Sequence, residues 1–264
     1  MLAGEMERER PSAVLAEVSQ VRRPSPALAR VTLAAPELDR FGYDGPDHLV
    51  RTFFPVADQA APVLPATTDW WGEVQEMPEE VRPVVRNYTV RRYDPERREI
   101  DIDFVLHGDK GPATRWANRA RPGQLIGLRS ERAGYQPTPG ADWQLIVGDE
   151  TSLPAIGSIV ESMPRGVHAK VFVEIAGDAE EQSFDTAADV ELHWLHRAGQ
   201  RAGTSDIIAR TLRAAELPDG ECYAWVAGES GMVTAVRRHL VRDRGVPKES
   251  IYFCGYWKHS TPTC

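Results

Sequence analysis

The sequence predicts a small antiparallel β-barrel followed by an α/β domain that contains a parallel sheet. Its first half consists of short strand-like runs separated by Pro and Gly residues, a pattern typical of antiparallel β-structure. Its second half alternates apolar strands with helix-like runs, as in a parallel sheet with crossover helices. Two prolines and a glycine interrupt the pattern at residues 136–140. We therefore expect a β-barrel domain over residues 1–138 and an α/β domain over residues 139–264.

The first half contains six candidate strands for the barrel: Val14–Val21, Ala29–Leu33, His48–Phe54, Arg86–Asp94, Glu99–Leu106 and Gln124–Leu128. Six short strands with one brief helix fit an antiparallel barrel better than a parallel sheet. Residues 56–83 are rich in Ala, Pro and Thr, include Trp70 and Trp71, and show no clear element. A stretch of that length is typical of a functional or mobile loop.

The second half contains five strand-like runs: Trp143–Val147, Lys170–Glu174, Val190–His193, Tyr223–Ala227 and Ser250–Cys254. Helix-like runs separate them at Ser152–Ser162, Thr204–Ala215 and Gly231–Arg244. This alternation predicts a domain like those that bind nucleotides, although the glycine fingerprint GxGxxG is absent. His193 and His196 fall in one strand and its exit, and without further ligands their spacing does not indicate a metal site.

The composition is that of an ordinary soluble globular protein, with 264 residues, 42% of them hydrophobic, and a net charge of −8. No apolar run is long enough to span a membrane, and the start MLAGEMERERPS lacks the apolar core of a signal peptide, so we expect a cytoplasmic protein. We also expect it to be a monomer. The three cysteines have no CxxC spacing, which argues against a disulfide framework or a zinc site. The acidic balance argues against nucleic-acid and membrane binding. An anionic substrate would therefore need a local basic patch.

The motif RNYTVRRYD, residues 86–94, places Arg86 and Tyr88 on one face of a strand, because alternate residues of a strand share a face. A cation beside an aromatic ring suits a ligand with a diphosphate and a flat heterocycle. Thr89 adds a hydroxyl nearby. A plain barrel strand with a solvated arginine is the alternative interpretation.

The motif HGDKGPATRWA, residues 107–117, follows an apolar strand. Pro112 fits the first turn of a helix, and the glycines beside it allow a close approach, so free N–H groups of Ala113, Thr114 and Arg115 face outward. Such a helix start binds phosphate. An ordinary strand–turn–helix is the alternative, and His107 by itself is more often a hydrogen-bonded structural residue than a catalyst.

Taken together, the motifs identify a protein family far more specifically than either motif does alone. RxYTxR, DFVxHGxxGPAxxWA, GDETSLPAI at Gly148–Ile156, AGES at Ala227–Ser230 and GYWK at Gly255–Lys258 follow one another in order. This series resembles the siderophore-interacting proteins, flavin-dependent ferric-siderophore reductases related to the ferredoxin–NADP reductase superfamily. The resemblance runs from about Val14 to Lys258.

The resemblance implies a six-stranded barrel that binds FAD and a C-terminal domain of the NAD(P)H-binding kind. By motif position, the residues that match the flavin site are Arg86, Tyr88, Thr89, Asp103, Phe104, Val105, His107, Gly111, Pro112, Ala113 and Thr114. The segment that matches the one facing flavin and nicotinamide is Asp149, Glu150, Thr151 and Ser152, where the family more often has Ala at Ser152. No residue is assigned a catalytic role.

The family also uses basic residues to hold an anionic ferric siderophore. The matching positions here are Arg51, Arg132 and Lys258. Around Arg132 this chain reads SERAG where the family string is GPRGS. A lone surface charge is normally just solvated, but three at family positions in an acidic chain favour a binding role.

The implied reaction is the release of iron by reduction. Ferric ion is held tightly by catecholate or hydroxamate oxygens and ferrous ion far more weakly, and flavin passes on the two electrons of a nicotinamide one at a time. Two other classes of function stay open: a general flavin or quinone reductase on the same scaffold, and a siderophore-binding module with no turnover.

The electron donor is expected to be NADH. Residues just past the second strand of such a domain commonly face the adenosine ribose, and here they include Asp178, Glu180 and Glu181, whereas a 2′-phosphate would need a base. Arg197 and Arg201 in a neighbouring loop would favour NADPH. Family members that use ferredoxin carry a longer C-terminal extension, and this chain ends six residues after Lys258, which argues against that variant.

Overall fold

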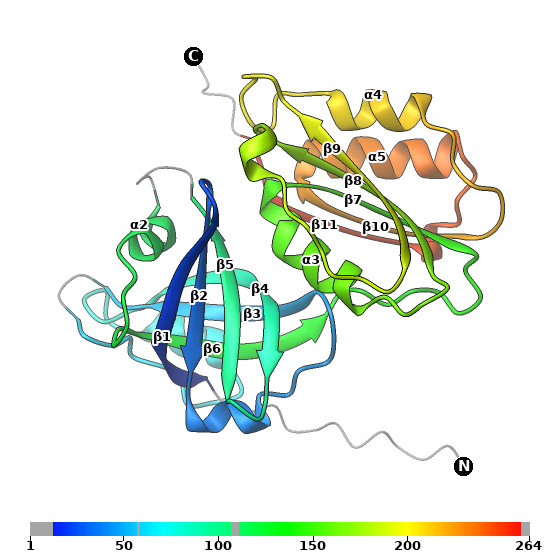
Figure 1. Ribbon diagram of the computed structural model, residues 1–264. Coiled ribbons are helices and arrows are strands. Elements are labelled where there is room, and N and C mark those ends of the chain that lie inside the picture. The colour runs from blue at the N-terminus through cyan, green and yellow to red at the C-terminus, as the bar shows by residue number, and fades with distance from the viewer. Residues whose placement is uncertain (1–12, 57–58, 107–110, 260–264) are drawn as a thin grey trace, which may run out of the picture. The chain divides into compact units, whose positions relative to one another are not determined.

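The computed structural model describes residues 13–56, 59–106 and 111–259, and it divides them into two compact units (Figure 1). The first unit holds residues 13–22, 30–44 and 48–132. The second holds residues 23–29, 45–47 and 133–259. The domain boundary between residues 138 and 139 stays a prediction.

The first unit is a closed barrel of six strands in the order β1-β2-β5-β4-β3-β6. The strands are β1 (Val14–Ser25), β2 (Leu28–Ala34), β3 (His48–Phe54), β4 (Val84–Asp94), β5 (Glu99–Val105) and β6 (Leu125–Ala133). The β1–β6, β3–β4 and β4–β5 pairs are antiparallel, so the predicted fold class is confirmed. Side chains alternate between buried and exposed along the start of β1, where Val14, Ala16 and Val18 point into the barrel.

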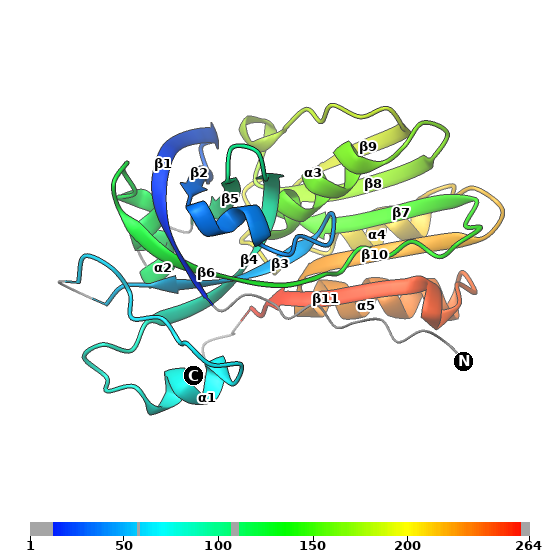
Figure 2. The same cartoon turned by 90° about the horizontal axis from the view of Figure 1, so that it is seen from below.

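The described part of the first unit also contains two short α-helices. The predicted one is α2 (Pro112–Asn118), and the other, α1 (Trp70–Glu76), lies in the connection between β3 and β4 (Figure 2). The expectation of a stretch without any element is therefore wrong for residues 70–76. Asp69 caps α1 by accepting a hydrogen bond from the backbone N–H of Gly72 (3.1 Å), and a Cβ at Gly72 would lie 2.4 Å from the Asp69 carboxylate.

The second unit is a five-stranded parallel sheet in the order β11-β10-β7-β8-β9. Its elements are β7 (Trp143–Asp149), α3 (Leu153–Ser162), β8 (His168–Ile175), β9 (Asp189–His196), α4 (Ile207–Ala214), β10 (Cys222–Glu229), α5 (Ser230–Arg242) and β11 (Ile251–Trp257). Helix α3 covers one face of the sheet, and α4 and α5 cover the other (Figure 1). His193 and His196 lie in β9, as predicted.

The strand order reverses at β7, which has β8 on one side and β10 on the other. In open parallel sheets of this kind, ligands bind outside the carboxyl ends of the strands at such a reversal. Here those ends carry Asp149 on β7 and Glu229 on β10. No helix within the described residues is long and apolar enough to cross a membrane.

Candidate functional site

Arg86 and Tyr88 lie on β4. The Tyr88 ring belongs to an aromatic group that it forms with the rings of Phe54 and Phe104. The Tyr88 ring lies 4.5 Å from that of Phe104 on β5, and burial raises the pKa of Tyr88 to about 12 although Arg86 opposes the rise. The exposed Arg86 guanidinium donates to the carbonyl oxygen of Val85 (2.7 Å), and no described carboxylate pairs with it. The pair therefore offers an aromatic ring and a guanidinium whose other N–H groups can bind a ligand.

Helix α2 packs against the same aromatic group. The centre of the Trp116 ring lies 5.4 Å from that of Phe54 and 5.7 Å from that of Phe104, and both of these rings also contact Tyr88. Gly111 precedes the helix with no side-chain cap, and the buried Nε1–H of Trp116 has no partner among the described residues. These donors and the Arg86 guanidinium fit a ligand with a diphosphate and a flat ring. The prediction of a free N–H at Arg115 is wrong, because this group donates to the carbonyl oxygen of Gly111 (2.9 Å). His107 lies outside the described residues.

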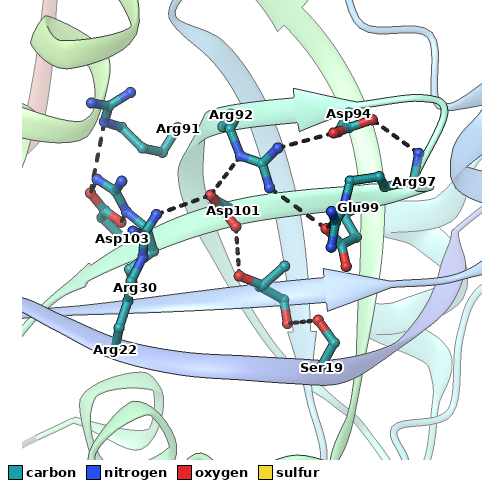
Figure 3. Close-up of polar contacts among 11 residues, drawn as sticks. Ser19, Arg22, Arg30, Arg91, Arg92, Asp94, Arg97, Glu99, Asp101 and Asp103 are labelled. Carbon is teal, nitrogen blue, oxygen red and sulfur yellow. Dashed lines mark hydrogen bonds and ion pairs between the residues drawn. The ribbon is translucent and has the colours of Figure 1, made fainter. Parts of the chain in front are cut away.

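The other predicted flavin residues lie on the same two strands. Phe104 is buried in the aromatic group, Thr89 is buried on β4, and Val105 ends β5 half-buried. Asp103 lies in an ion-pair cluster on the barrel wall, where Arg30 binds both of its oxygens at 2.5 and 2.6 Å (Figure 3). Both Asp103 oxygens are therefore already engaged by the protein.

Of the three predicted basic residues, Arg51 has the most contacts. It donates to Glu131 (3.3 Å) and to Asn87, and its guanidinium lies 5.4 Å from the centre of the Trp70 ring. Arg129, which sequence reasoning missed, binds the same Glu131 (2.5 Å) and lies 5.5 Å from the same ring.

The other two predicted basic residues are both exposed to solvent. Arg132 is exposed at the end of β6, and Lys258 is exposed after β11 in the second unit.

At the carboxyl end of β7, Asp149 ties the parallel strands together. Its Oδ2 accepts from the Glu229 N–H (2.8 Å) and the Trp257 indole (2.9 Å), and its Oδ1 accepts from the Thr151 N–H (2.9 Å). Burial raises the pKa of Asp149. Ser152 donates to the Asp149 carbonyl (2.7 Å), so the GDETS motif forms a tight turn here.

The neighbouring Glu150 and Glu174 share one cation. Arg197 binds both oxygens of Glu150 at 2.5 and 2.7 Å and lies 3.6 Å from Glu174. Burial raises the pKa of Glu174 to about 7, although Arg197 opposes the rise. Arg197 itself is only 6% exposed. It is therefore committed to these carboxylates.

A cavity of about 370 Å³ opens beside these carboxylates, against α4 and α5. Its polar lining includes Asp149, Glu174, Ser205, Asp206, Arg213 and Glu229. Sequence reasoning placed an acidic ribose site instead at residues 175–181. There, Glu180 accepts from the Ser25 hydroxyl and the Ala27 N–H (3.1 Å), and Glu181 pairs with His196 (2.8 Å). The sequence does contain a pattern that predicts this cavity. An acidic residue lies at or next to the carboxyl end of three parallel strands: Asp149 on β7, Glu174 on β8 and Glu229 on β10.

Glu229 also occupies the start of α5. Its carboxylate accepts from the N–H groups of Gly231 (2.5 Å) and Met232 (2.9 Å), and from that of His259 (3.1 Å). The helix start that would attract a phosphate therefore already holds an anion. The cavity fits sugar hydroxyls, which donate to carboxylates, and it does not fit a pyrophosphate at α5.

These features define a class of protein: a two-unit flavoprotein reductase, with a closed antiparallel barrel that carries the cation–tyrosine pair and a parallel α/β sheet. The chain matches the family described as siderophore-interacting FAD-binding domain over residues 17–133 and the family described as siderophore-interacting protein over residues 141–260. This protein belongs to the siderophore-interacting protein family.

Individual proteins similar to this chain support the same family assignment. The chain is 32% identical to the ferric vibriobactin reductase ViuB of Vibrio cholerae, over 97% of this chain and 93% of that protein. A siderophore utilization protein from T. fusca has a TM-score of 0.81 at 35% identity, with 94% of both chains covered. The siderophore-interacting protein SipS from Aeromonas hydrophila has a TM-score of 0.77 at 31% identity, covering 94% of this chain and 99% of that one. More distant ferredoxin reductases share the fold alone.

Proposed function

We propose that this protein is a cytoplasmic FAD-dependent oxidoreductase that reduces ferric siderophores, with NADH as its electron donor. The observation that carries the proposal is the Arg86–Tyr88 pair beside the uncapped start of α2, in a chain of the siderophore-interacting family. A relative of nearly the same length is named a ferric vibriobactin reductase.

The barrel residues fit FAD. Arg86 would bind the diphosphate together with the N–H groups of Ala113 and Thr114, and Tyr88 would lie against the flat ring. Phe104 and Trp116 hold the Tyr88 side of this site rigid through ring contacts. FAD, when bound, accepts two electrons at once and releases them singly. The chain itself contributes binding, orientation and electrostatics.

The acceptor would be drawn to the protein by local cations. A ferric siderophore that carries net negative charge is attracted by Arg51, Arg132 and Lys258, even though the whole chain has a charge of −8. Reduction to ferrous ion weakens the binding of iron by hard oxygen ligands and so frees the metal. Iron is thus the substrate's cargo.

The acidic cavity supports NADH over NADPH. A 2′-phosphate near Glu174, Asp206 and Glu229 would meet like charges, whereas a ribose diol can donate hydrogen bonds to the carboxylates. Arg197, the residue expected to favour NADPH, is buried between Glu150 and Glu174. Arg213 is the cation in the lining of this cavity.

The cofactor is tested by purifying the protein, denaturing it and identifying the released flavin. We expect FAD, and we expect Arg86→Ala to lose most of it. The matched control is Arg97→Ala, an arginine of the same barrel that is 69% exposed, and this variant should keep its FAD. Recovery of FMN alone, or full FAD retention by Arg86→Ala, would contradict the assignment.

The donor and acceptor are tested by anaerobic kinetics of flavin reduction and reoxidation. We expect kcat/KM to be at least tenfold higher for NADH than for NADPH, and ferric siderophores to reoxidise the flavin faster than quinones. A preference for NADPH, or reduction by ferredoxin alone, overturns the donor. Faster reoxidation by quinones indicates a general reductase, and absence of turnover indicates a binding module.

A further inference from the structure

The connection between β3 and β4 holds an exposed tryptophan next to a cluster of charges. Trp71 on α1 is 52% exposed, and its ring lies 5.4 Å from that of Trp70. Trp70 in turn lies under the guanidiniums of Arg51 and Arg129. This tryptophan pair was already notable in the sequence of residues 56–83, and the function proposed above gives Trp71 no role.

The helix that carries Trp71 is anchored through the residues on either side of it. The ring of Trp70 packs edge-on against that of Phe53 at 5.9 Å, and Val74 of the same helix is only 1% exposed. The Glu73 carboxylate clamps the preceding chain by accepting from the N–H groups of Ala66 and Thr67 at 3.0–3.1 Å. An exposed aromatic side chain on an anchored helix loses less backbone freedom when it binds a partner.

The charges beside Trp70 are not balanced. Arg51 and Arg129 both pair with Glu131, so the three side chains together carry one net positive charge. Their side chains remain 28% and 15% exposed. A ligand that is both anionic and aromatic would match this surface, because its ring stacks on the indole while its charge faces the guanidiniums.

Resting on the proposed function, we propose that Trp71, together with Trp70, Arg51 and Arg129, forms an aryl-recognition subsite for the ferric chelate. The substrate class is accordingly a siderophore that binds iron through catecholate or phenolate rings. A ferric tris-catecholate is anionic and presents flat rings, whereas a ferric tris-hydroxamate is neutral and has no ring in its iron-binding groups. The subsite therefore favours the first class by both stacking and charge.

The test measures binding to the FAD-loaded protein without turnover. Gallium(III) replaces iron, since it forms complexes of the same shape but is not reduced, and a tris-catecholate and a tris-hydroxamate complex are titrated by calorimetry. We expect Trp71→Leu to weaken binding of the catecholate complex roughly tenfold and to leave the hydroxamate complex unchanged. Trp71→Phe keeps a ring and should retain most of the affinity.

A matched control comes from the second unit, where Phe253 is 48% exposed and also lies beneath an arginine, with Arg237 4.4 Å from the ring centre. Phe253→Leu should bind both complexes like the parent. Glu131→Gln should tighten binding of the anionic catecholate complex, because the shared carboxylate no longer offsets the two guanidiniums. Equal binding of both complexes by the parent, or an unchanged affinity in Trp71→Leu, overturns the subsite.

These results separate the subsite from the proposed function. If reduced holoprotein is not reoxidised by any ferric siderophore, the proposed function fails, and with it the inference that depends on it. If ferric siderophores reoxidise the flavin but Trp71→Leu leaves catecholate binding unchanged, the function stands and the subsite alone is refuted.

Discussion

Replacing Asp47 by Asn should make the protein more stable at alkaline pH and leave it nearly unchanged at acidic pH. Asp47 belongs to the segment Gly45–Asp47 of the second unit and is only 4% exposed. Its carboxylate accepts from the Trp225 indole (2.9 Å) and the Tyr256 hydroxyl (3.1 Å). Its φ of 56° is a left-handed conformation that Asn also tolerates, so the substitution changes charge with little change of shape.

The magnitude follows from the pKa of this carboxyl. Burial raises the pKa of Asp47 from 3.8 to about 7, against the two hydrogen bonds, which lower it. Between these values the folded protein holds a proton that the unfolded chain has released, so the free energy of unfolding falls as pH rises from about 4 to 7. A pKa difference of about three corresponds to roughly 4 kcal/mol. Asn carries no such charge, so Asp47→Asn avoids this loss.

The assay is thermal unfolding of the parent and of Asp47→Asn at pH 4 and pH 8. We expect little difference at pH 4 and a midpoint higher in the variant by on the order of 8 °C at pH 8, since about 2 °C corresponds to 1 kcal/mol in a chain of this size. Asp219→Asn, at an exposed position of the same unit, is the matched control and should show no such pH-dependent gain. A variant that is less stable than the parent at pH 8 would refute the reasoning.

Three further predictions concern other parts of the molecule. Arg30→Leu leaves the buried carboxylate of Asp103 without its bidentate partner and should lower the free energy of unfolding by about 3 kcal/mol, measured by denaturant titration. Gly148→Ala places a Cβ 1.9 Å from the Ser152 hydroxyl oxygen and 2.9 Å from a backbone carbonyl, so it should cost about 1–3 kcal/mol, and adding Ser152→Ala should recover only part of the thermal midpoint. Lys258→Ala should raise the apparent KM for an anionic ferric siderophore roughly two- to fivefold at low salt and leave flavin reduction by the donor unchanged; an unchanged KM would remove this residue from the substrate site.

Much of the fold follows from local sequence patterns. The runs WQLIV and YAWVA are apolar except for Gln144, as expected for parallel strands covered on both faces, and they lie in β7 and β10. The Pro at position 112 marks the start of α2, because its missing N–H costs nothing in the first turn. In each case a few neighbouring residues determine the element.

Features that depend on distant residues were not predictable. Helix α1 has seven residues and exists because Asp69 caps it and Glu73 clamps the chain before it, which no periodicity reveals. The partnership of Arg51 with Glu131 and Trp70 arises from the pairing of strands around the barrel.

The acidic cavity also depends on residues that are distant in the sequence and could not be predicted from local patterns. Glu174, Asp206 and Glu229 are widely separated in sequence, and the parallel sheet and its connections bring them to one edge. Glu180 was predicted as a ribose ligand from its position after β8, but its carboxylate is taken up by Ser25 and Ala27, far away in the chain. Burial and pairing decide which carboxylates remain available, and they are properties of the folded chain.

The most direct test of the central claim is to reduce the purified FAD-loaded protein with NADH under anaerobic conditions and then mix it with a ferric siderophore. The visible absorbance of the flavin and a chromogenic chelator specific for ferrous iron are recorded together. Ferric siderophore reduction predicts that the oxidised flavin spectrum returns as ferrous iron appears, with two ferrous ions formed for each flavin reoxidised. A flavin that stays reduced in the presence of ferric catecholate and hydroxamate siderophores alike, with no ferrous iron formed, would contradict the claim.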